Sequence, residues 1–526
     1  MNRWLAYLFV VLFWAAAYLP GLGTKALKGE EARRSLPAIE MLETGDWLVP
    51  HLNGAPYLRK PPLINWAIAA SLYVVNYRDE WVVRLPSVLA MLAMASVLFW
   101  TALRWLSLPC AFAAAVISLS SIGLWEKGSL AEIDAMYSAL TGMAFAVWIA
   151  AWARRETGWR LWLFPGLCLG VAMLAKGPLN LLLFYGVIIP LLVAAGEQRQ
   201  LWSRAHAVAL GLGLIIVAAW VIPYLQATAA LDPGTVWADQ MQSSMGRGKA
   251  SKILANELST LANGLPWLLF VPLLWWRKAW AELEERQQLL ITVLRWPLTL
   301  AFLGLTLIPG MLPRYTLPLS AAVSLLLAMV LPAVGARFHR GWKWFCVTVV
   351  AAAMLAAIFG PLWGRPGEID WLAYLPCAAL GVVFLIQKRH FMGDASARLA
   401  VLPALSFAAV IAVYAAVGVP RFHEEVPVTI SGRGITEAVP RDATLAIVDP
   451  GYEPVFFYIE RPLIFVPAVE KLPEEAHYIL LAAPEDWNIN GMIPGGKILG
   501  TFPGQGSRQL VLIFRGDGPD SPVAQR

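Results

Sequence analysis

The sequence predicts an α-helical protein that crosses a membrane many times and ends in a small soluble α/β domain. Of its 526 residues, 58% are hydrophobic and only 14% are charged, whereas about a quarter of the residues in soluble domains are charged. Long apolar runs recur through residues 1–419, but residues 420–526 contain only short ones, separated by proline, glycine and charged residues. Composition therefore divides the chain into a transmembrane domain, 1–419, and a C-terminal soluble domain, 420–526.

About thirteen apolar segments qualify as transmembrane helices, because a span needs roughly 20 apolar residues and at least about 17. Many of the 25 tryptophans lie near the ends of these segments, as residues of an interfacial belt do. The predicted segments are 4–22, 82–103, 109–125, 133–152, 160–175, 178–195, 206–224, 264–276, 297–310, 315–333, 344–362, 370–387 and 399–418.

A further apolar run, 62–77, decides which side of the membrane each later connection faces. If this run does not span, the even-numbered connections are rich in Lys and Arg, whereas most odd-numbered ones are poor in both. Because Lys and Arg concentrate in cytoplasmic loops, we expect 62–77 to lie in the interface or to re-enter the membrane. The N-terminus is then cytoplasmic. A first loop (23–81), a second large loop (225–263) and the C-terminal domain face outward.

The C-terminal domain is predicted from three β-rich runs, TLAIVD, HYILLAA and QLVLIF, with helical spacers between them. Residues 421–526 carry 9 Lys+Arg against 14 Asp+Glu, a net of −5, and the rest of the chain carries 32 against 21, a net of +11. The basic excess belongs to the membrane part, where lipid headgroups and cytoplasmic loops explain it, so it does not indicate nucleic acid. The domain shows no nucleophile, metal cluster or phosphate loop, which favours a lid or an interaction role.

The stretch Gly29–Trp66 carries unusual charge for a segment between apolar runs: GEEARRSLPAIEMLETGDWLVPHLNGAPYLRKPPLINW. Charge is costly near a bilayer, so an acid for proton chemistry and a base for a phosphate would explain it. Glu30 and Glu31 open a short amphipathic helix, for which Gly45 is a plausible stop. They could equally cap that helix or pair with Arg33 and Arg34 on the surface. From the residues alone the two interpretations are even.

Asp134 is a second candidate, because a carboxylate at the start of a membrane helix is functional by default. It lies in SLAEIDAMYSALTGMAFAVW, at the outer mouth of the fourth predicted span. Glu132 is two residues away, and residues two apart do not share a helix face. We therefore expect at most one of these acids to point into a common cavity, and interpret Glu132 as part of a helix cap.

Several cations lie near the outward ends of the spans. Each one alone is typical of a side chain that reaches toward lipid headgroups, but together they suit a phosphate or pyrophosphate. LRKPP holds Lys60 in extended backbone before two prolines, and AKGP places Lys176 in a tight turn. The cations are Lys60, Lys176, Arg247, Lys249 and Arg314, the last followed by Tyr315.

Other kinds of chemistry lack a sequence signal. The six His are scattered and no pair has metal-ligand spacing, so no metal site is indicated. The four Cys are isolated and form no CxxC. There is no Walker loop, no GxGxxG after a strand and no GxSxG, which argues against a nucleotide-fuelled pump.

The stretch from Glu30 to Trp66 resembles the first outward loop of bacterial membrane glycosyltransferases of the GT-C class. These include the lipid A 4-amino-4-deoxy-L-arabinose transferases and relatives of the protein O-mannosyltransferases. The matching motifs are Glu30, Glu31-Ala32-Arg33, Gly45-Asp46-Trp47-Leu48-Val49-Pro50, Leu52-Asn53-Gly54, Tyr57, Lys60-Pro61 and Trp66. Further matches are Asp134, Lys176-Gly177, Arg314-Tyr315, the thirteen spans and the outward soluble tail.

The resemblance implies a GT-C fold and an inverting transfer from a polyprenyl-phosphate sugar, carried by undecaprenyl phosphate. The acceptor would be a glycolipid such as lipid A, a glycan or a protein, on the periplasmic face of the bacterial inner membrane. Membrane lipids would be the other partners, and no cofactor is indicated, although a divalent metal stays open.

The resemblance also implies roles for single residues. An acid of the first loop, Glu30 or Glu31, would act as base on the acceptor, with Asp134 as a second acid and Arg33 in support. The donor phosphate would be held by Lys60, Lys176, Arg247, Arg314, Tyr315 and Tyr57. Two positions depart from the family, which usually has Asp at position 30 and, in the aminoarabinose transferases, a metal-binding Glu where this chain has Arg59.

Two other classes compete with this interpretation. A transporter would also have many spans with charges between them, but the charges above cluster on the outward face and no internal repeat is evident. Another envelope enzyme, such as an O-antigen ligase or polymerase, would also use polyprenyl-linked sugars. The motif match favours the glycosyltransferase.

Overall fold

The structure is a computed structural model. It describes the chain apart from residues 1, 28, 233, 235, 237, 239–252, 308–311, 364–368, 421–426, 452, 485–492, 494, 505–507 and 517–526. The chain forms two compact units, and each is assembled from separate stretches of sequence. Residues 1–22, 58–64 and 84–421 form the bundle unit, and residues 23–57, 65–83 and 422–526 form the loop–sheet unit.

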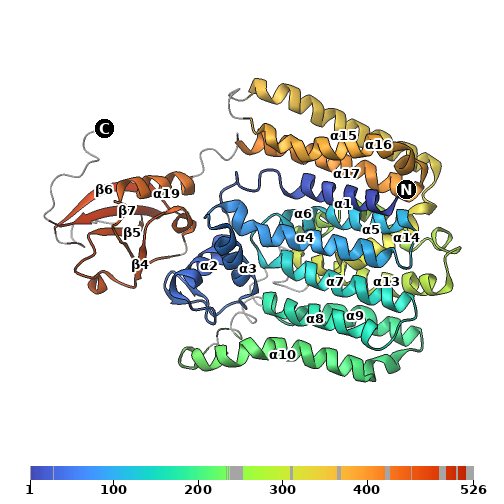
Figure 1. Ribbon diagram of the computed structural model, residues 1–526, viewed down its shortest axis with the longest axis horizontal. Helices are drawn as coiled ribbons and strands as arrows, with labels where there is room; N and C mark the ends of the chain where they lie inside the picture. Colours follow the sequence, from blue (N-terminus) through green and yellow to red (C-terminus); the bar gives the residue numbers. More distant parts are fainter. Residues whose placement is uncertain are drawn as a thin grey trace. The chain divides into compact units, whose positions relative to one another are not determined.

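The bundle unit is built from helices (Figure 1). α16 and α17 pack on α1, and α15 packs on α17, while α7 packs on α8, and α8 packs on α9 and α10. Its helices are α1 (Arg3–Tyr18), α4 (Glu80–Ala102, which begins in the other unit), α5 (Leu108–Leu119), α6 (Ile122–Gly128), α7 (Ile133–Ala153), α8 (Trp159–Lys176), α9 (Leu179–Ala194), α10 (Arg204–Ala227), α12 (Ile253–Asn263), α13 (Glu285–Gly304), α14 (Ser320–Val330), α15 (Ala336–Trp363), α16 (Leu375–Gly393) and α17 (Ala395–Val413), with the 3-10 helices η4 (Trp267–Leu274) and η7 (Pro313–Leu319).

All the predicted transmembrane segments fall on helical segments of the bundle unit. By length and composition, seven described spans are long and apolar enough to cross a membrane, or nine if each of two bent helix pairs is one span. The bent pairs are α5 with α6, at 60°, and α12 with η4, at 90°. The other four predicted segments form α1, α8, α9 and α13, which are too short or too polar by that measure. The predicted class, a helical multi-span membrane protein, is confirmed.

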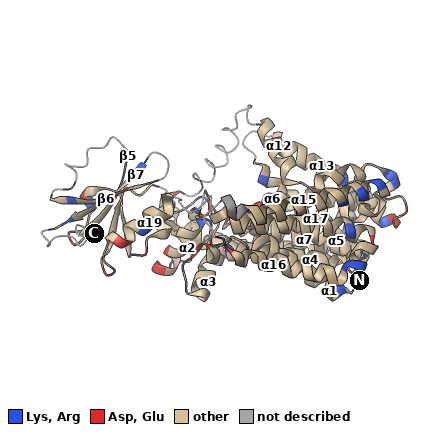
Figure 2. Ribbon diagram, turned by 90° about the horizontal axis from the view of Figure 1, so that it is seen from above, with Lys and Arg blue, Asp and Glu red and all other residues tan. Residues whose placement is uncertain are grey.

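The run 62–77 forms α3 (Leu63–Val75), a helix of 13 residues. At 1.5 Å per residue such a helix is about 20 Å long, shorter than the roughly 30 Å of a bilayer core. This length agrees with a helix that does not span. In the bundle unit, Lys and Arg gather at the end where α1 begins (Figure 2). Which end faces the cytoplasm stays a prediction.

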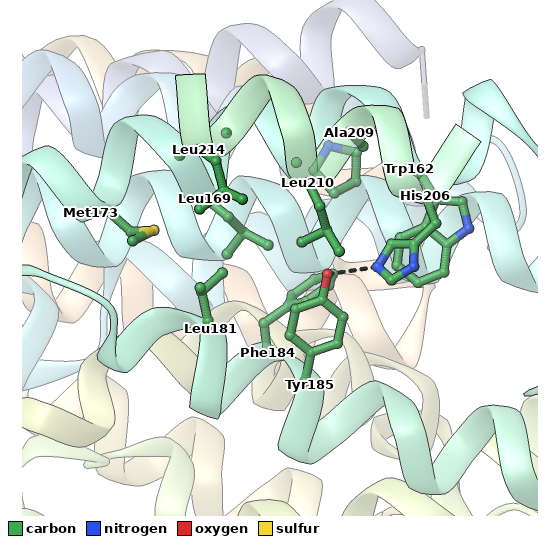
Figure 3. A pocket seen from close by; sticks show the side chains of 14 residues that line it. Trp162, Leu169, Met173, Leu181, Phe184, Tyr185, His206, Ala209, Leu210 and Leu214 are labelled. Carbon is green, nitrogen blue, oxygen red and sulfur yellow. Dashed lines mark hydrogen bonds between the residues drawn. The ribbon is translucent and has the colours of Figure 1, made fainter. Parts of the chain in front are cut away.

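Small residues let α8 and α10 approach closely. A Cβ added to Gly170 would lie 2.6 Å from Cα of Gly213, and one added to Gly166 would lie 2.8 Å from Cβ of Ala209. Such contacts are typical of helices that pack inside membranes. The helices leave an apolar pocket between α8, α9 and α10, closed at one end by a hydrogen bond of 2.8 Å between Tyr185 Oη and His206 Nε2 (Figure 3). This packing fixes the axis of α8, which ends at Lys176.

The C-terminal part of the loop–sheet unit is a five-stranded mixed sheet in the order β4-β3-β5-β7-β6. β3 pairs in parallel with β4 and β5, whereas β7 is antiparallel to β5 and β6. The three predicted β-rich runs are confirmed as β3 (Leu445–Val448), β5 (Tyr478–Pro484) and β7 (Arg508–Arg515). β4 (Leu463–Val466), β6 (Gly496–Pro503) and α19 (Pro427–Ala438) complete the fold.

The first loop belongs to the same unit as this sheet. It contains α2 (Ala32–Thr44), which ends at Gly45 with φ +75° as predicted, and a hairpin of β1 (His51–Leu52) and β2 (Ala55–Pro56). The segment 451–458 of the C-terminal part contacts the loop through hydrogen bonds. Leu27 N donates to Tyr458 Oη (2.7 Å), Asn53 Nδ2 to the Gly451 carbonyl (2.9 Å) and Arg78 to the Phe456 carbonyl (2.8 Å). The C-terminal part is therefore also a support for the first loop.

Candidate active site

A buried ionic cluster lies in the bundle unit where three elements meet. Asp134 is in the first turn of α7, Lys176 is the last residue of α8, and Arg314 follows Pro313 in η7. Lys176 Nζ lies 2.5 Å from Asp134 Oδ1, and Arg314 Nε lies 3.4 Å from Asp134 Oδ2. The two oxygens of one carboxylate thus hold two different cations.

The local sequence explains how these side chains converge. α8 ends at Lys176 because Gly177 has a φ of +94°, which a residue with a Cβ rarely adopts, and Pro178 follows. α7 starts only at Ile133, so Asp134 lies in a first turn, where a negative charge complements the helix dipole. Since α7 packs on both α8 and η7, the three charged groups meet.

Glu132 is a further member of the cluster, and here the expectation from sequence is wrong. Its carboxylate lies 3.7 Å from Arg314 Nη1 and 3.3 Å from Lys127 Nζ, the latter near the end of α6. Glu132 is the residue before α7 and has extended backbone (φ −120°, ψ 154°). Because it is not in the helix, the rule that residues two apart point to different faces does not apply, and both acids reach Arg314.

The charged groups of the cluster are equal in number but differ in exposure. Among the described residues it contains three acids, Glu126, Glu132 and Asp134, and three cations, Lys127, Lys176 and Arg314. Side chains of Asp134 and Lys176 are only 2% and 7% exposed, whereas Arg314 is 28% exposed. Burial raises the pKa of Glu132, and the nearby Lys127 and Arg314 act in the opposite direction. A partly exposed guanidinium beside a buried ammonium group suits an anionic ligand.

Aromatic rings line the same cations. Lys176 Nζ lies 4.0 Å from the ring centroid of Tyr315 and 5.6 Å from that of Tyr137. Cation–π contacts of this kind orient an ammonium group without neutralising its charge. The predicted residue Tyr315 therefore joins the cluster, and Tyr137 joins it without having been predicted.

A second ionic cluster surrounds Glu30 in the loop–sheet unit. Arg33 Nη1 lies 2.8 Å from Glu30 Oε1, and Arg34 Nη2 lies 2.7 Å from Glu30 Oε2. Arg34 also donates to Tyr57 Oη at 3.0 Å. The side chain of Glu30 is 32% exposed, whereas Glu31 is buried and its carbonyl accepts from Ser35. Glu30 is therefore the accessible acid of the pair.

The other motifs of the first loop build its backbone. Asn53 and Gly54 both have positive φ (57° and 73°) and form the turn of the β1–β2 hairpin. Glu40, which the sequence did not single out, binds the turn through the N–H groups of Asn53 (2.6 Å) and Gly54 (3.0 Å). Asp46 accepts from Leu48 N and Val49 N. These residues thus shape the loop that carries Glu30.

The structure brings most, but not all, of the predicted site residues together. Asp134, Lys176, Arg314 and Tyr315 share one cluster, and Glu30, Arg33 and Tyr57 share the other. Lys60, half-buried before Pro61, belongs to the bundle unit. Arg247 and Lys249 lie outside the described residues. The sequence offered Arg34 as a surface partner of the two acids, and the structure shows that it pairs with Glu30 but is buried.

Three comparisons place the chain among known proteins. A family model described as dolichyl-phosphate-mannose-protein mannosyltransferase matches residues 59–223. The undecaprenyl phosphate-alpha-4-amino-4-deoxy-L-arabinose arabinosyl transferase of Erwinia tasmaniensis is 30% identical over 60% of this chain and 58% of its own. The transferase of the same name from Yersinia enterocolitica is 29% identical over 61% of this chain and 58% of its own. The chain thus spans less than two thirds of the length of these relatives.

Among solved structures, ArnT from Cupriavidus metallidurans bound to undecaprenyl phosphate covers 98% of this chain and 99% of its own, with a TM-score of 0.69 and 18% identity. The apo state of that protein gives a TM-score of 0.67. The chain has an ArnT-like GT-C fold. The predicted fold class and the predicted resemblance to GT-C glycosyltransferases are both confirmed.

Proposed function

We propose that this ArnT-like protein is an inverting glycosyltransferase that uses a polyprenyl-phosphate sugar as donor. The carrier is undecaprenyl phosphate, and the acceptor lies on the periplasmic face of a bacterial inner membrane. The N-terminus is cytoplasmic, and the large loops and the C-terminal domain are periplasmic. The proposal joins the residues of the two ionic clusters to the fold that the chain shares with ArnT.

One observation carries the proposal: the cluster of Asp134, Lys176 and Arg314. Lys176 and Arg314 meet at one carboxylate, that of Asp134, and Arg314 is partly exposed. A phosphate brings negative charge and several acceptor oxygens to these two cations. Arg314 binds phosphate oxygens in a planar fork and Lys176 binds as a point charge. In the proposed reaction they hold the donor phosphate, together with Tyr315, Lys60, Arg247 and Tyr57.

The reaction breaks the bond between the anomeric carbon and the donor phosphate and forms a bond to the acceptor oxygen. The transition state has oxocarbenium character, and the acceptor hydroxyl loses its proton to Glu30. Arg33 and Arg34 orient the Glu30 carboxylate. The leaving phosphate needs charge stabilisation rather than a proton, and the cations supply it. Asp134, as the second acid, holds Lys176 and Arg314 in place.

The finer assignment is the sugar and its acceptor. We propose 4-amino-4-deoxy-L-arabinose as the sugar and lipid A as the acceptor, because the curated relatives are named for that sugar. The family model instead names mannosyl transfer to protein. Transfer to a protein, or to a polysaccharide, is therefore the alternative. Position 59 is Arg and not the Glu of the aminoarabinose transferases. This difference is a reason to test the alternative acceptors as well.

The deciding experiment compares the envelope of cells with and without the protein by mass spectrometry. A lipid A species heavier by one aminoarabinose, present only with the protein, supports the finer proposal. If a mannosylated protein or a modified glycan appears only with the protein, the acceptor is that protein or glycan and not lipid A. Two negative results together would contradict the glycosyltransferase assignment itself. Cells without the protein would lack no sugar on any envelope component, and the purified protein would transfer no sugar from undecaprenyl-phosphate donors.

Topology is tested separately by cysteine labelling. The chain has four cysteines, all in apolar segments, so a Leu58→Cys variant adds a reactive site in the first loop. We expect an impermeant maleimide to label it in intact spheroplasts. Labelling only after the cytoplasmic side is opened would overturn the proposed orientation.

A further inference from the structure

Glu132 is a buried acid at the edge of the Asp134 cluster. The sequence predicts only a helix cap for it, and the proposed reaction gives it no role. Its side chain is 7% exposed. It occupies the position before α7 where a side chain often caps a helix, yet within the described structure its carboxylate caps no N–H group of α7. The burial of this carboxylate is therefore not explained by helix capping.

The ionic contacts of Glu132 explain its burial. The guanidinium of Arg314 lies between two acids, with Nη1 3.7 Å from Glu132 and Nε 3.4 Å from Asp134. The same oxygen of Glu132, Oε2, is 3.3 Å from Lys127 Nζ. Lys127 comes from α6, Glu132 precedes α7 and Arg314 comes from η7, so Glu132 ties three elements together.

Without Glu132, the charges would rearrange. Arg314 would keep a single acid, Asp134, whose Oδ1 already holds Lys176 at 2.5 Å. The guanidinium would turn fully onto Asp134, since a planar fork prefers a carboxylate that it can bind with two N–H groups. It would then face a carboxylate and not an incoming anion, and would have to leave this partner before it could bind a phosphate.

We propose that Glu132 is a positioning residue, which holds Arg314 off a full pairing with Asp134 and so keeps its guanidinium available for the donor phosphate. The inference rests on the proposed function. Glu132 itself touches neither the sugar nor the phosphate, and acts through Arg314.

The test uses the full-length protein in lipid nanodiscs and measures the Kd of undecaprenyl phosphate. We expect Glu132→Gln to weaken binding about tenfold, the scale of one lost charge–charge contact. Glu132→Asp keeps the charge on a shorter side chain and should recover part of the affinity. Glu126→Gln is the matched control, because Glu126 also lies near Lys127 (3.4 Å) but is 54% exposed and is not paired with Arg314. It should bind as the wild type does.

A double-mutant cycle separates positioning from a general structural effect. If Glu132 acts through Arg314, Glu132→Gln should weaken binding no further in an Arg314→Met background. In turnover assays, KM for the donor should rise in Glu132→Gln while kcat changes little.

The outcomes are distinct. Wild-type protein that binds no undecaprenyl phosphate would overturn the proposed function, and this inference with it. Wild-type protein that binds, together with equal Kd values for the wild type, Glu132→Gln and Glu132→Asp, would overturn the inference alone. Additive losses in the double variant would also overturn it. If Glu132→Gln does not fold, the Glu132→Asp variant and its cycle with Arg314→Met decide by the same criteria.

Discussion

Lys176 and Asp134 form a buried ion pair, with Nζ 2.5 Å from Oδ1 and side chains that are 7% and 2% exposed. Removing Lys176 leaves the buried Asp134 with Arg314 as its one remaining cation of the pair it holds, whereas removing both Lys176 and Asp134 takes away the buried acid as well. We expect Lys176→Met to destabilise the protein by about 3 kcal/mol, and the double variant with Asp134→Asn to recover much of that loss. Sugar transfer should be abolished in both.

Thermal unfolding in detergent, followed beside a transfer assay, checks this prediction. Arg104→Met is the control, because its pair with Glu156 (3.2 Å) leaves Arg104 51% exposed, and such a pair is worth about 1 kcal/mol or less. A double variant that is less stable than Lys176→Met would contradict the prediction. So would a double variant that still transfers sugar.

The two arginines beside Glu30 provide a matched pair. Both touch its carboxylate, at 2.8 Å and 2.7 Å, but Arg33 is 34% exposed and Arg34 only 3%. Arg34 also binds Tyr57, so it fixes two groups at once. A lysine keeps the charge but lacks the rigid planar fork with which Arg34 holds Glu30 and Tyr57 at once. We expect Arg34→Lys to lower transfer at least about tenfold, and Arg33→Lys at most about fivefold, the limit for an exposed ion pair.

Initial rates at saturating donor and acceptor, with equal amounts of folded protein, measure this difference. Equal losses in the two lysine variants would show that burial and the Tyr57 contact do not matter. A larger loss in Arg33→Lys would reverse the assignment.

The pH dependence of donor binding reports on Glu132. Burial raises the pKa of its carboxyl, and Asp134 does so too, while Lys127 and Arg314 lower it. With the pKa raised, the carboxyl gains its proton at a higher pH than an ordinary glutamate, whose pKa is about 4.3. The neutral form no longer holds Arg314. The affinity advantage of the wild type over Glu132→Gln should therefore be largest near neutral pH and shrink on acidification.

Kd values for undecaprenyl phosphate between about pH 8 and about pH 5 test this, given that the phosphate itself titrates near pH 6. The free lipid titrates equally in both measurements, so the ratio of the two Kd values removes its contribution. A ratio that stays constant, or grows as the pH falls, would contradict the prediction.

The sequence predicted those parts whose signal is local. The end of α2 at Gly45 follows from the tolerance of glycine for positive φ. β3, β5 and β7 follow from apolar runs of β-formers, and the buried faces of these strands form the core of the sheet. Asp134 and Lys176 stood out because charge at the end of a membrane helix needs a reason.

Other features depend on contacts that no local pattern shows. β6 was not predicted, because it is a mostly exposed edge strand that contains Gly496 and Gly500, and glycine weakens a strand signal. The 60° bend between α5 and α6 interrupts an apolar run that reads as one span. The place of Glu132 depends on α7 starting one residue after it. Helix starts are defined only to within a residue or two from sequence.

Gly54 tests the packing of the first loop on the C-terminal sheet within the loop–sheet unit. Its φ is +73°, and a Cβ there would lie 3.2 Å from Cβ of Phe465 in β4. Gly45 has nearly the same φ, +75°, but no described atom lies within 4 Å of an added Cβ. Alanine at either position pays for left-handed backbone, about 1–2 kcal/mol, but only at position 54 must the neighbour also move.

Gly54→Ala should therefore lower the melting temperature more than Gly45→Ala, and should also reduce transfer, because Asn53 and Gly54 hold the turn that Glu40 binds. The backbone cost is shared by the two variants, so their difference reports on the contact with Phe465. Phe465→Gly removes the Cβ that the new methyl group would meet, so Gly54→Ala and Gly45→Ala should lower the melting temperature by more similar amounts in a Phe465→Gly background. Equal melting temperatures for Gly54→Ala and Gly45→Ala would mean that the loop does not rest on the sheet as described.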